Sequence, residues 1–125
     1  MTIAGWCVLI AGLMPYVLVG LAKSRRDFDN ARPRAWLAEV GGWRQRAQWA
    51  QLNSFEAFPF FVAGVVIAQQ ADAPQGWVDG LAVAFIAARL AYSTFYIVDR
   101  PGWRSIAWSC GIALVIGLFV AAAIP

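Results

Sequence analysis

The sequence contains no histidine, only two cysteines and only seven acidic residues among 125 residues. Histidine and cysteine are the side chains that most often hold zinc or haem iron, and the two cysteines here have no ligand-type neighbours. We therefore predict no metal site. Cys7 and Cys110 lie in the first and the last apolar run of the chain. On the topology derived below they are near opposite membrane faces, too far apart to form a disulfide.

Charge of either sign is also scarce, since charged residues make up 14% of the chain and hydrophobic residues 61%. Soluble domains carry about a quarter charged residues. Four apolar runs of about 20 residues use most of the chain, and this is the length that crosses a bilayer core. We predict one all-α integral membrane domain over residues 1–125, a four-helix bundle with helices at about 3–22, 44–70, 77–98 and 104–124. The first run lacks a basic n-region and a cleavage site, so we expect a retained helix rather than a signal peptide.

The basic residues are concentrated in two of the three connections between these runs. Seven of the ten lie within residues 23–46, Arg100 and Arg104 lie between the third and fourth runs, and the connection between the second and third runs has none. The positive-inside rule places both basic connections in the cytoplasm and both termini outside. Orientation at the membrane surface explains the net charge of +3 better than nucleic acid does, because no recognition helix or aromatic-basic stripe is present.

Polar residues enter the second apolar run over residues 46–59, RAQWAQLNSFEAFP. Arg46, Asn53 and Glu56 share one helix face, because their spacings of seven and three residues are close to whole turns. A glutamate deep in a membrane-spanning helix is costly and has to face protein or a water-filled cavity. The pattern predicts either a ligand site or an internal salt bridge that only fixes helix packing.

The third run carries a second polar stripe, with Arg89, Tyr92 and Tyr96 spaced at i, i+3 and i+7. Arg89 lies near mid-span, at the depth of Glu56 on the neighbouring antiparallel helix. An isolated arginine at that depth would be very costly, so we predict an ion pair between Arg89 and Glu56 that is structural first. Tyr92 and Tyr96 then lie toward the cytoplasmic end, level with Asn53.

Arranged by depth, these polar residues are expected to converge on the cytoplasmic half of the bundle. The set above the predicted ion pair is Arg46, Asn53, Tyr92, Tyr96, Arg104 and Ser105. A polar pocket with a positive balance suits an amphiphilic anion whose carboxylates can be held by arginine. The sequence has no nucleophilic triad and no phosphate-binding glycine loop. Any chemistry should therefore depend on a reactive group that the ligand brings.

The same residues resemble the motifs of a known family. The run Arg46-Ala47-x-x-Ala50-x-x-Asn53-x-x-Glu56-x-Phe58-Pro59 resembles the signature of the MAPEG family, the membrane-associated proteins in eicosanoid and glutathione metabolism. Arg89-x-x-Tyr92-x-x-x-Tyr96 and Pro101-x-x-Arg104-Ser105 resemble the third-helix and fourth-helix motifs of that family. The arrangement of four membrane spans agrees too, so the resemblance covers essentially the whole chain. The resemblance is to a bacterial-type member of the family.

The resemblance implies a homotrimer that binds glutathione, as co-substrate, between neighbouring subunits in the cytoplasmic half of the membrane. By position, Arg104 would stabilise the glutathione thiolate and Tyr96 would assist as a hydroxyl donor. The residues implied to bind glutathione are Arg46, Gln51, Asn53, Glu56, Arg89, Tyr92, Tyr96 and Ser105, with Gln51 reaching the ligand of a neighbouring subunit. The chain departs from the family pattern at Trp49, where several members have a basic residue.

Two functions follow as hypotheses. The first is a glutathione-dependent enzyme of the glutathione transferase or peroxidase type, acting on lipophilic electrophiles by conjugation, peroxide reduction or isomerisation. The alternative is a non-catalytic membrane protein of the same fold that binds lipid or serves assembly, because family membership does not prove catalysis. In either case we expect a multi-pass protein of a bacterial inner membrane, in contact with lipids and a lipophilic small molecule and not with nucleic acid.

Overall fold

The chain folds into four long helices and one short one, described over all of residues 1–125 by a computed structural model. The long helices are α1 (Ile3–Ala22), α3 (Gly42–Gln70), α4 (Gln75–Ile97) and α5 (Pro101–Ala123), and the short helix is α2 (Pro33–Glu39). Each of the long helices is long and apolar enough to cross a membrane. The predicted all-α architecture with four membrane spans is therefore confirmed.

The helix ends follow from local backbone chemistry. Thr2 accepts a hydrogen bond from the Gly5 amide and caps α1. Gly41 and Gly42 have positive φ angles of 67° and 60°, which turn the chain sharply after α2, so that α3 begins at Gly42 rather than at residue 44. Pro101 occupies the first turn of α5, where a backbone N–H would have no partner within the helix, so proline costs no hydrogen bond there. This helix begins three residues before the expected start at 104.

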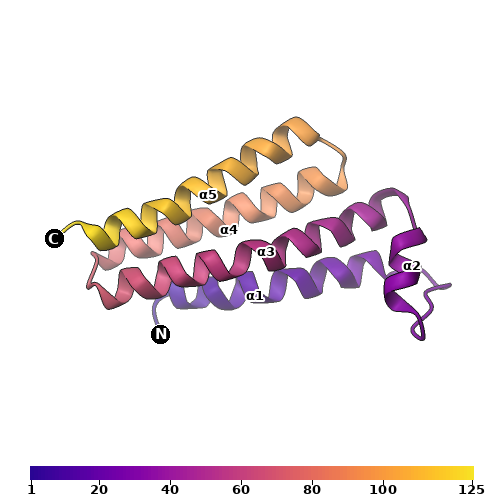
Figure 1. The fold of residues 1–125 in the computed structure, drawn as a ribbon, viewed down its shortest axis with the longest axis horizontal. Coiled ribbons are helices and arrows are strands. Elements are labelled where there is room, and N and C mark those ends of the chain that lie inside the picture. The colour runs from indigo at the N-terminus through magenta and orange to yellow at the C-terminus, as the bar shows by residue number, and fades with distance from the viewer.

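The four long helices run side by side, and α2 lies across one end of the bundle (Figure 1). Helix α1 packs mainly along α3, α4 packs mainly along α5, and α3 joins the two pairs by contacting both α4 and α5. The two termini and the α3–α4 connection lie at the end opposite α2, and the α4–α5 connection lies at the same end as α2 (Figure 1). The two basic connections are thus at one end of the molecule.

Most of the apolar core lies in the half of the bundle nearest the termini. Phe61 and Phe85 stack there with ring centroids 4.0 Å apart, and Val65, Val115 and Leu118 complete the centre of the cluster. A smaller cluster of Ala22, Leu37 and Ala47 fixes α2 to the bundle at the other end. The main core thus leaves the α2 half of the α3, α4 and α5 helices for polar side chains.

The connection from α1 to α2 is held by aromatic and ionic contacts. Arg25 and Asp27 form an ion pair at 2.6 Å, the Arg25 guanidinium lies 5.4 Å from the Trp36 ring, and Phe28 meets Trp36 edge to face at 5.0 Å. The hydrogen bond from Arg25 lowers the pKa of the Asp27 carboxyl below its usual value. These contacts give the predicted basic loop a defined shape beside α2.

Candidate functional site

Three hollows lie between α3, α4 and α5 in the polar half of the bundle, and Asn53 lines all of them. We name them the apolar pocket, the Trp49 pocket and the Arg104 pocket. Asn53 and Glu56 come from α3, Arg89, Tyr92 and Tyr96 from α4, and Arg104 and Ser105 from the first turns of α5. We predicted from the sequence that these side chains converge, and in the fold they line these three neighbouring hollows.

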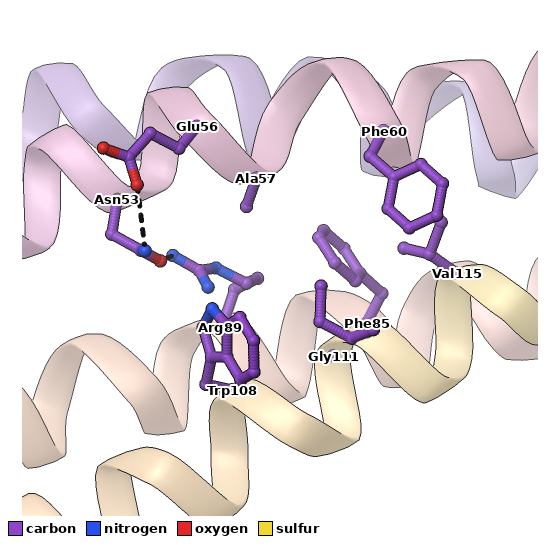
Figure 2. Close-up of a pocket in the computed structure, with 10 residues that line it drawn as sticks. Asn53, Glu56, Ala57, Phe60, Phe85, Arg89, Trp108, Gly111 and Val115 are labelled. Carbon is purple, nitrogen blue, oxygen red and sulfur yellow. Dashed lines mark hydrogen bonds between the residues drawn. The ribbon is translucent and has the colours of Figure 1, made fainter.

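A hydrogen-bonded chain of three side chains crosses from α3 to α4 (Figure 2). The Arg89 guanidinium donates to Asn53 Oδ1 at 2.7 Å, and Asn53 Nδ2 donates to Glu56 Oε2 at 3.4 Å. Arg89 is only 4% exposed, and its guanidinium lies 4.3 Å from the Tyr92 ring centroid. The predicted direct ion pair between Arg89 and Glu56 is therefore wrong, because Asn53 stands between the two charges.

The apolar pocket extends from this chain toward the core and has a volume of about 190 Å³. Its polar end is formed by Asn53, Glu56 and Arg89, and its apolar lining consists of Ala57, Phe60, Phe85, Trp108, Gly111, Ile112 and Val115. Figure 2 shows Trp108 beside Arg89, with Phe60 and Phe85 on the far side of the hollow. The pocket can receive a small apolar group next to the hydrogen-bonded chain.

The Arg104 pocket is a hollow of about 220 Å³ where α4 meets α5. It is lined by Asn53, Tyr92, Tyr96, Arg104, Ser105 and Trp108. The Arg104 guanidinium lies 4.4 Å from the Tyr96 ring centroid, and Tyr92 meets Tyr96 edge to face at 5.7 Å. Arg104 has no carboxylate partner, because the only ion pair of the chain joins Arg25 to Asp27. An uncompensated cation beside two phenols and a serine is suited to hold an anion.

The Trp49 pocket is the widest of the three, at about 480 Å³. It is lined by Trp49, Leu52, Asn53, Glu56, Tyr92 and Tyr96. The Trp49 and Tyr96 rings face each other with centroids 6.3 Å apart and planes tilted by 49°. Glu56 is an exposed carboxylate in this single chain, although it sits halfway along α3.

Two of the predicted ligand-binding residues lie outside these hollows. Arg46 uses its Nε to donate to the Ile97 carbonyl oxygen at 3.0 Å, so it ties α3 to the last turn of α4. Gln51 is half-buried and lines none of the three pockets. Within one subunit, the two residues are therefore separate from the group around Asn53.

Several pocket residues were not among the predicted ligand-binding set. Trp108 lines both the apolar and the Arg104 pocket, and Phe60 and Phe85 line the apolar pocket. A helical reading could have found Trp108, because it follows Arg104 by four residues and so shares its face. Phe60 likewise follows Glu56 by four residues. In a membrane-spanning helix, a sequence pattern predicts that such apolar side chains face lipid. It therefore does not identify them as pocket-lining residues.

Comparison with known proteins gives one match. The model of the MAPEG family matches residues 3–124, which is nearly the whole chain. No curated protein and no solved structure matches the chain.

Proposed function

The chain belongs to the MAPEG family, and from that premise we propose that it is a glutathione-dependent membrane enzyme of the glutathione transferase or peroxidase type. The match over residues 3–124, with four helices able to span a membrane, makes it a multi-pass integral membrane protein. We propose that the enzyme acts on lipophilic electrophiles through a glutathione thiolate stabilised by Arg104. A bacterial inner membrane is the proposed location.

The observation that carries this proposal is the uncompensated charge of Arg104. Its guanidinium lines a hollow together with Tyr96 and Ser105, and no carboxylate neutralises it. Arginine stays charged at any working pH, so it favours a bound thiolate over the neutral thiol. We assign to Tyr96, which lines the same hollow, a hydrogen bond from its hydroxyl to the same sulfur. The thiolate is the nucleophilic form, and a neighbouring cation raises its population at neutral pH.

The polar side chains around Asn53 fit the remainder of a thiol tripeptide. Asn53, Tyr92, Tyr96 and Ser105 supply amide and hydroxyl groups that can both donate and accept hydrogen bonds. Glu56 and Arg89 add one charge of each sign at the deeper edge. Arg46 and Gln51 complete the proposed binding set from outside the three pockets, and we assign Gln51 to the ligand of a neighbouring subunit.

The proposed chemistry needs no nucleophile from the protein, because the glutathione thiolate is the attacking group. In conjugation, the thiolate sulfur donates its electron pair to the electrophilic carbon and forms a carbon–sulfur bond, while the leaving group departs with the electrons of its own bond. The apolar pocket beside Trp108 can hold an apolar part of the electrophile next to the sulfur. In peroxide reduction the same thiolate attacks one peroxide oxygen, the O–O bond breaks, and the other oxygen leaves and is protonated to an alcohol. A second glutathione then attacks the sulfenic acid formed, giving glutathione disulfide and water.

A homotrimer is part of this proposal. Glu56 is exposed on a single chain although it sits halfway along a membrane-spanning helix, where a carboxylate facing lipid would be very costly. A neighbouring subunit that covers this face of α3 removes the cost and places the pockets at a subunit interface. Native mass spectrometry of the protein released from detergent should give three chains per particle, and a monomer would contradict this part of the proposal.

The decisive experiment is a titration of the purified protein in detergent with glutathione. The proposal requires a saturable heat or spectral change in the wild type and in Arg100→Leu, a control that removes an exposed arginine of the α4–α5 connection. The alternative, a non-catalytic protein that binds lipid or serves assembly, requires no glutathione binding at any workable concentration. Absence of saturable binding would therefore favour that alternative.

A further inference from the structure

A groove between α1 and α4 lies apart from the three pockets described above. It has a volume of about 410 Å³, and its lining residues lie between Ile10 and Leu21 on α1 and between Leu90 and Ile97 on α4. Its apolar side chains are open to the surroundings, since Val17 is 63% exposed and Leu90 is 54% exposed. Because both helices are able to span a membrane, this surface meets lipid.

The groove occupies only the half of the bundle nearest α2 (Figure 1). In the other half α1 and α4 pack closely, with the Ala4 amide bonded to Asp79 and with Ala4 and Ala82 in one core cluster. From Ile10 to Leu21 a helix advances about 16 Å, and this is roughly half of the ~30 Å hydrocarbon core of a bilayer. The groove therefore matches the depth of one leaflet.

The chain is basic where it leaves the groove at the α2 end. Four basic residues follow the two helices there, against two acidic ones: Lys23, Arg25, Arg26 and Arg100, with Asp27 and Asp99. We name the four basic residues the basic rim. Asp27 neutralises only Arg25, because these two form the only ion pair of the chain. Anionic headgroups attract basic residues close to the membrane surface, so the rim fits a lipid of negative charge.

Ser93 adds a polar group to this apolar groove. It is 5% exposed and its Oγ is buried without a hydrogen-bond partner, whereas the neighbouring Thr94 donates to the Leu90 carbonyl oxygen at 2.8 Å. A hydroxyl without an acceptor in apolar surroundings is costly, and serine can turn its hydroxyl to another staggered position, toward an acceptor in the groove. Ser93 lies one turn before Ile97, about 6 Å from the α2 end of the groove. The interfacial layer of a bilayer adds roughly 5–8 Å at each face, so the ester carbonyl oxygens of a phospholipid come to this depth.

We propose that the α1–α4 groove binds one anionic phospholipid of the leaflet at the α2 end. An acyl chain lies in the groove, an ester carbonyl oxygen accepts a hydrogen bond from Ser93, and the phosphate meets the basic rim. The lipid completes the packing of α1 against α4 over the half of the bundle where the two helices separate. This inference goes beyond the proposed function, because none of these residues lines a pocket around Asn53.

Native mass spectrometry of the full chain in detergent tests the headgroup, with dioleoyl phosphatidylglycerol and dioleoyl phosphatidylcholine as probes. The two share their acyl chains and differ in net charge. We expect one phosphatidylglycerol per chain, bound about tenfold or more tightly than phosphatidylcholine. Lys23→Gln/Arg26→Gln should remove most of this preference, and Arg32→Gln/Arg34→Gln, which removes two exposed charges beside α2, should keep it. Equal binding of the two lipids to the wild type, or equal losses in the two double variants, would overturn the proposal.

Filling the groove tests the place of the acyl chain. Val17→Trp and Leu90→Trp should each weaken phosphatidylglycerol binding by about tenfold or more, because the added ring takes the space of the chain. Val83→Trp is the matched control, since Val83 is 50% exposed on α4 and lines neither the groove nor the three pockets. Equal binding by the three variants would place the lipid elsewhere and overturn the proposal.

A neighbouring subunit is the rival occupant of the groove. In that case Val17→Trp would change the number of chains per particle in the same mass spectra, while lipid binding would be the same in the wild type and in Leu90→Trp. This result would overturn the proposal as well.

An ether-linked analogue of dioleoyl phosphatidylglycerol, which has no ester carbonyls, tests Ser93. The wild type should bind the ester form about threefold or more tightly, as for loss of a hydrogen bond, and Ser93→Ala should bind the two forms equally. Thr94→Val is the control and should keep the difference, because Thr94 uses its hydroxyl within α4. Equal binding of the two forms to the wild type would overturn the placement of the ester at Ser93.

Discussion

Two arginines of this molecule, Arg89 and Arg104, show how the surroundings of a charge decide its use. Arg89 is 4% exposed and donates to Asn53 at 2.7 Å, so its charge is engaged inside the bundle. Arg104 has an aromatic neighbour, Tyr96, but no anion. The first arginine is suited to hold helices together and the second to hold an anion.

The role of Arg104 predicts a spectroscopic effect. A free thiol with a pKa of about 8.5 is only a few per cent ionised at pH 7, and lowering that value by about two units would make most of it thiolate. We expect Arg104→Leu to abolish the thiolate absorbance seen on adding glutathione, and to reduce turnover of a model electrophile by about tenfold or more. Each unit by which the thiol pKa is lowered corresponds to about 1.4 kcal/mol of stabilisation of the thiolate relative to the thiol. Glutathione affinity should fall less, because other residues hold the rest of the tripeptide.

Tyr96→Phe is the comparison for this prediction. The phenol can donate a hydrogen bond to the sulfur but brings no charge, so its loss should weaken the thiolate signal without removing it. A full thiolate signal in Arg104→Leu, together with its loss in Tyr96→Phe, would identify Tyr96 as the activating residue instead.

The chain of hydrogen bonds through Asn53 predicts which pair of residues is coupled. Asn53→Leu leaves the buried Arg89 guanidinium without a hydrogen-bond partner, and a buried polar group left unsatisfied costs about 1–3 kcal/mol, with charged groups at the upper end or above. In Asn53→Leu/Arg89→Leu much of this loss should be recovered, giving a coupling energy of about 0.5–3 kcal/mol in a double-mutant cycle. Thermal unfolding in detergent measures it. A larger coupling between Glu56 and Arg89 than between Asn53 and Arg89 would contradict the observed arrangement.

The pairing of Arg89 marks the limit of what the sequence could predict at the residue scale. Helical spacing placed Glu56 and Arg89 at one depth on facing helices, with Asn53 one turn nearer the cytoplasmic end. It could not decide which of two side chains one turn apart would meet the guanidinium, since Asn53 and Glu56 are equally available on that face. Which of the two meets Arg89 depends on how α3 is rotated about its own axis relative to α4.

At the scale of the elements, hydropathy located the spans and local chemistry adjusted their ends. Residues 3–22 were expected as the first helix, and α1 has these bounds. Helices α3 and α5 begin earlier than predicted because Gly41, Gly42 and Pro101 determine the local backbone conformation. These three residues can be recognised in the sequence. The contact that fixes the start of α1 from outside was not visible, because it comes from a residue 75 positions away.

That contact is a hydrogen bond from the Ala4 amide of α1 to Asp79 Oδ1 of α4, at 2.9 Å. Amides in the first turn of a helix have no partner within the helix, and an acidic side chain supplies one. We expect Asp79→Ala to lower the free energy of unfolding by about 0.5–2 kcal/mol, as for loss of a helix cap. Gln70→Ala, which removes an exposed side chain without hydrogen bonds near the same end, is the control. A loss no larger than in the control would mean that Asp79 does not stabilise α1.

At the scale of the whole molecule, the sequence predicted the fold well because the bilayer length and the charge pattern restrict a short apolar chain so strongly. The pockets were harder to predict. Their polar members follow from motifs, but Trp108 and Phe60 are apolar side chains that line hollows rather than face lipid. Only the packing of α5 against α3 and α4 distinguishes these two uses.

The arrangement of the helices also determines how the chain can sit in a membrane. The α1–α2 and α4–α5 connections lie at one end of the bundle, and the termini and the α3–α4 connection lie at the other (Figure 1). The first end carries six basic residues between 23 and 44, together with Arg100, and the α3–α4 connection carries none. Since basic connections stay in the cytoplasm, we expect the α2 end to be cytoplasmic, and the Arg104 pocket with it.

Accessibility of introduced cysteines tests this orientation. Cys110 is exposed and Cys7 is buried, and both are free, so the test begins from a variant in which alanine replaces the two of them. Arg26→Cys lies at the α2 end and Gln70→Cys at the other, and both positions are exposed. A maleimide that cannot cross membranes should label Arg26→Cys only from the cytoplasmic side and Gln70→Cys only from the outside. Labelling of Gln70→Cys from the cytoplasm alone would reverse the orientation and place the Arg104 pocket on the outer side, where it could not draw on cytoplasmic glutathione.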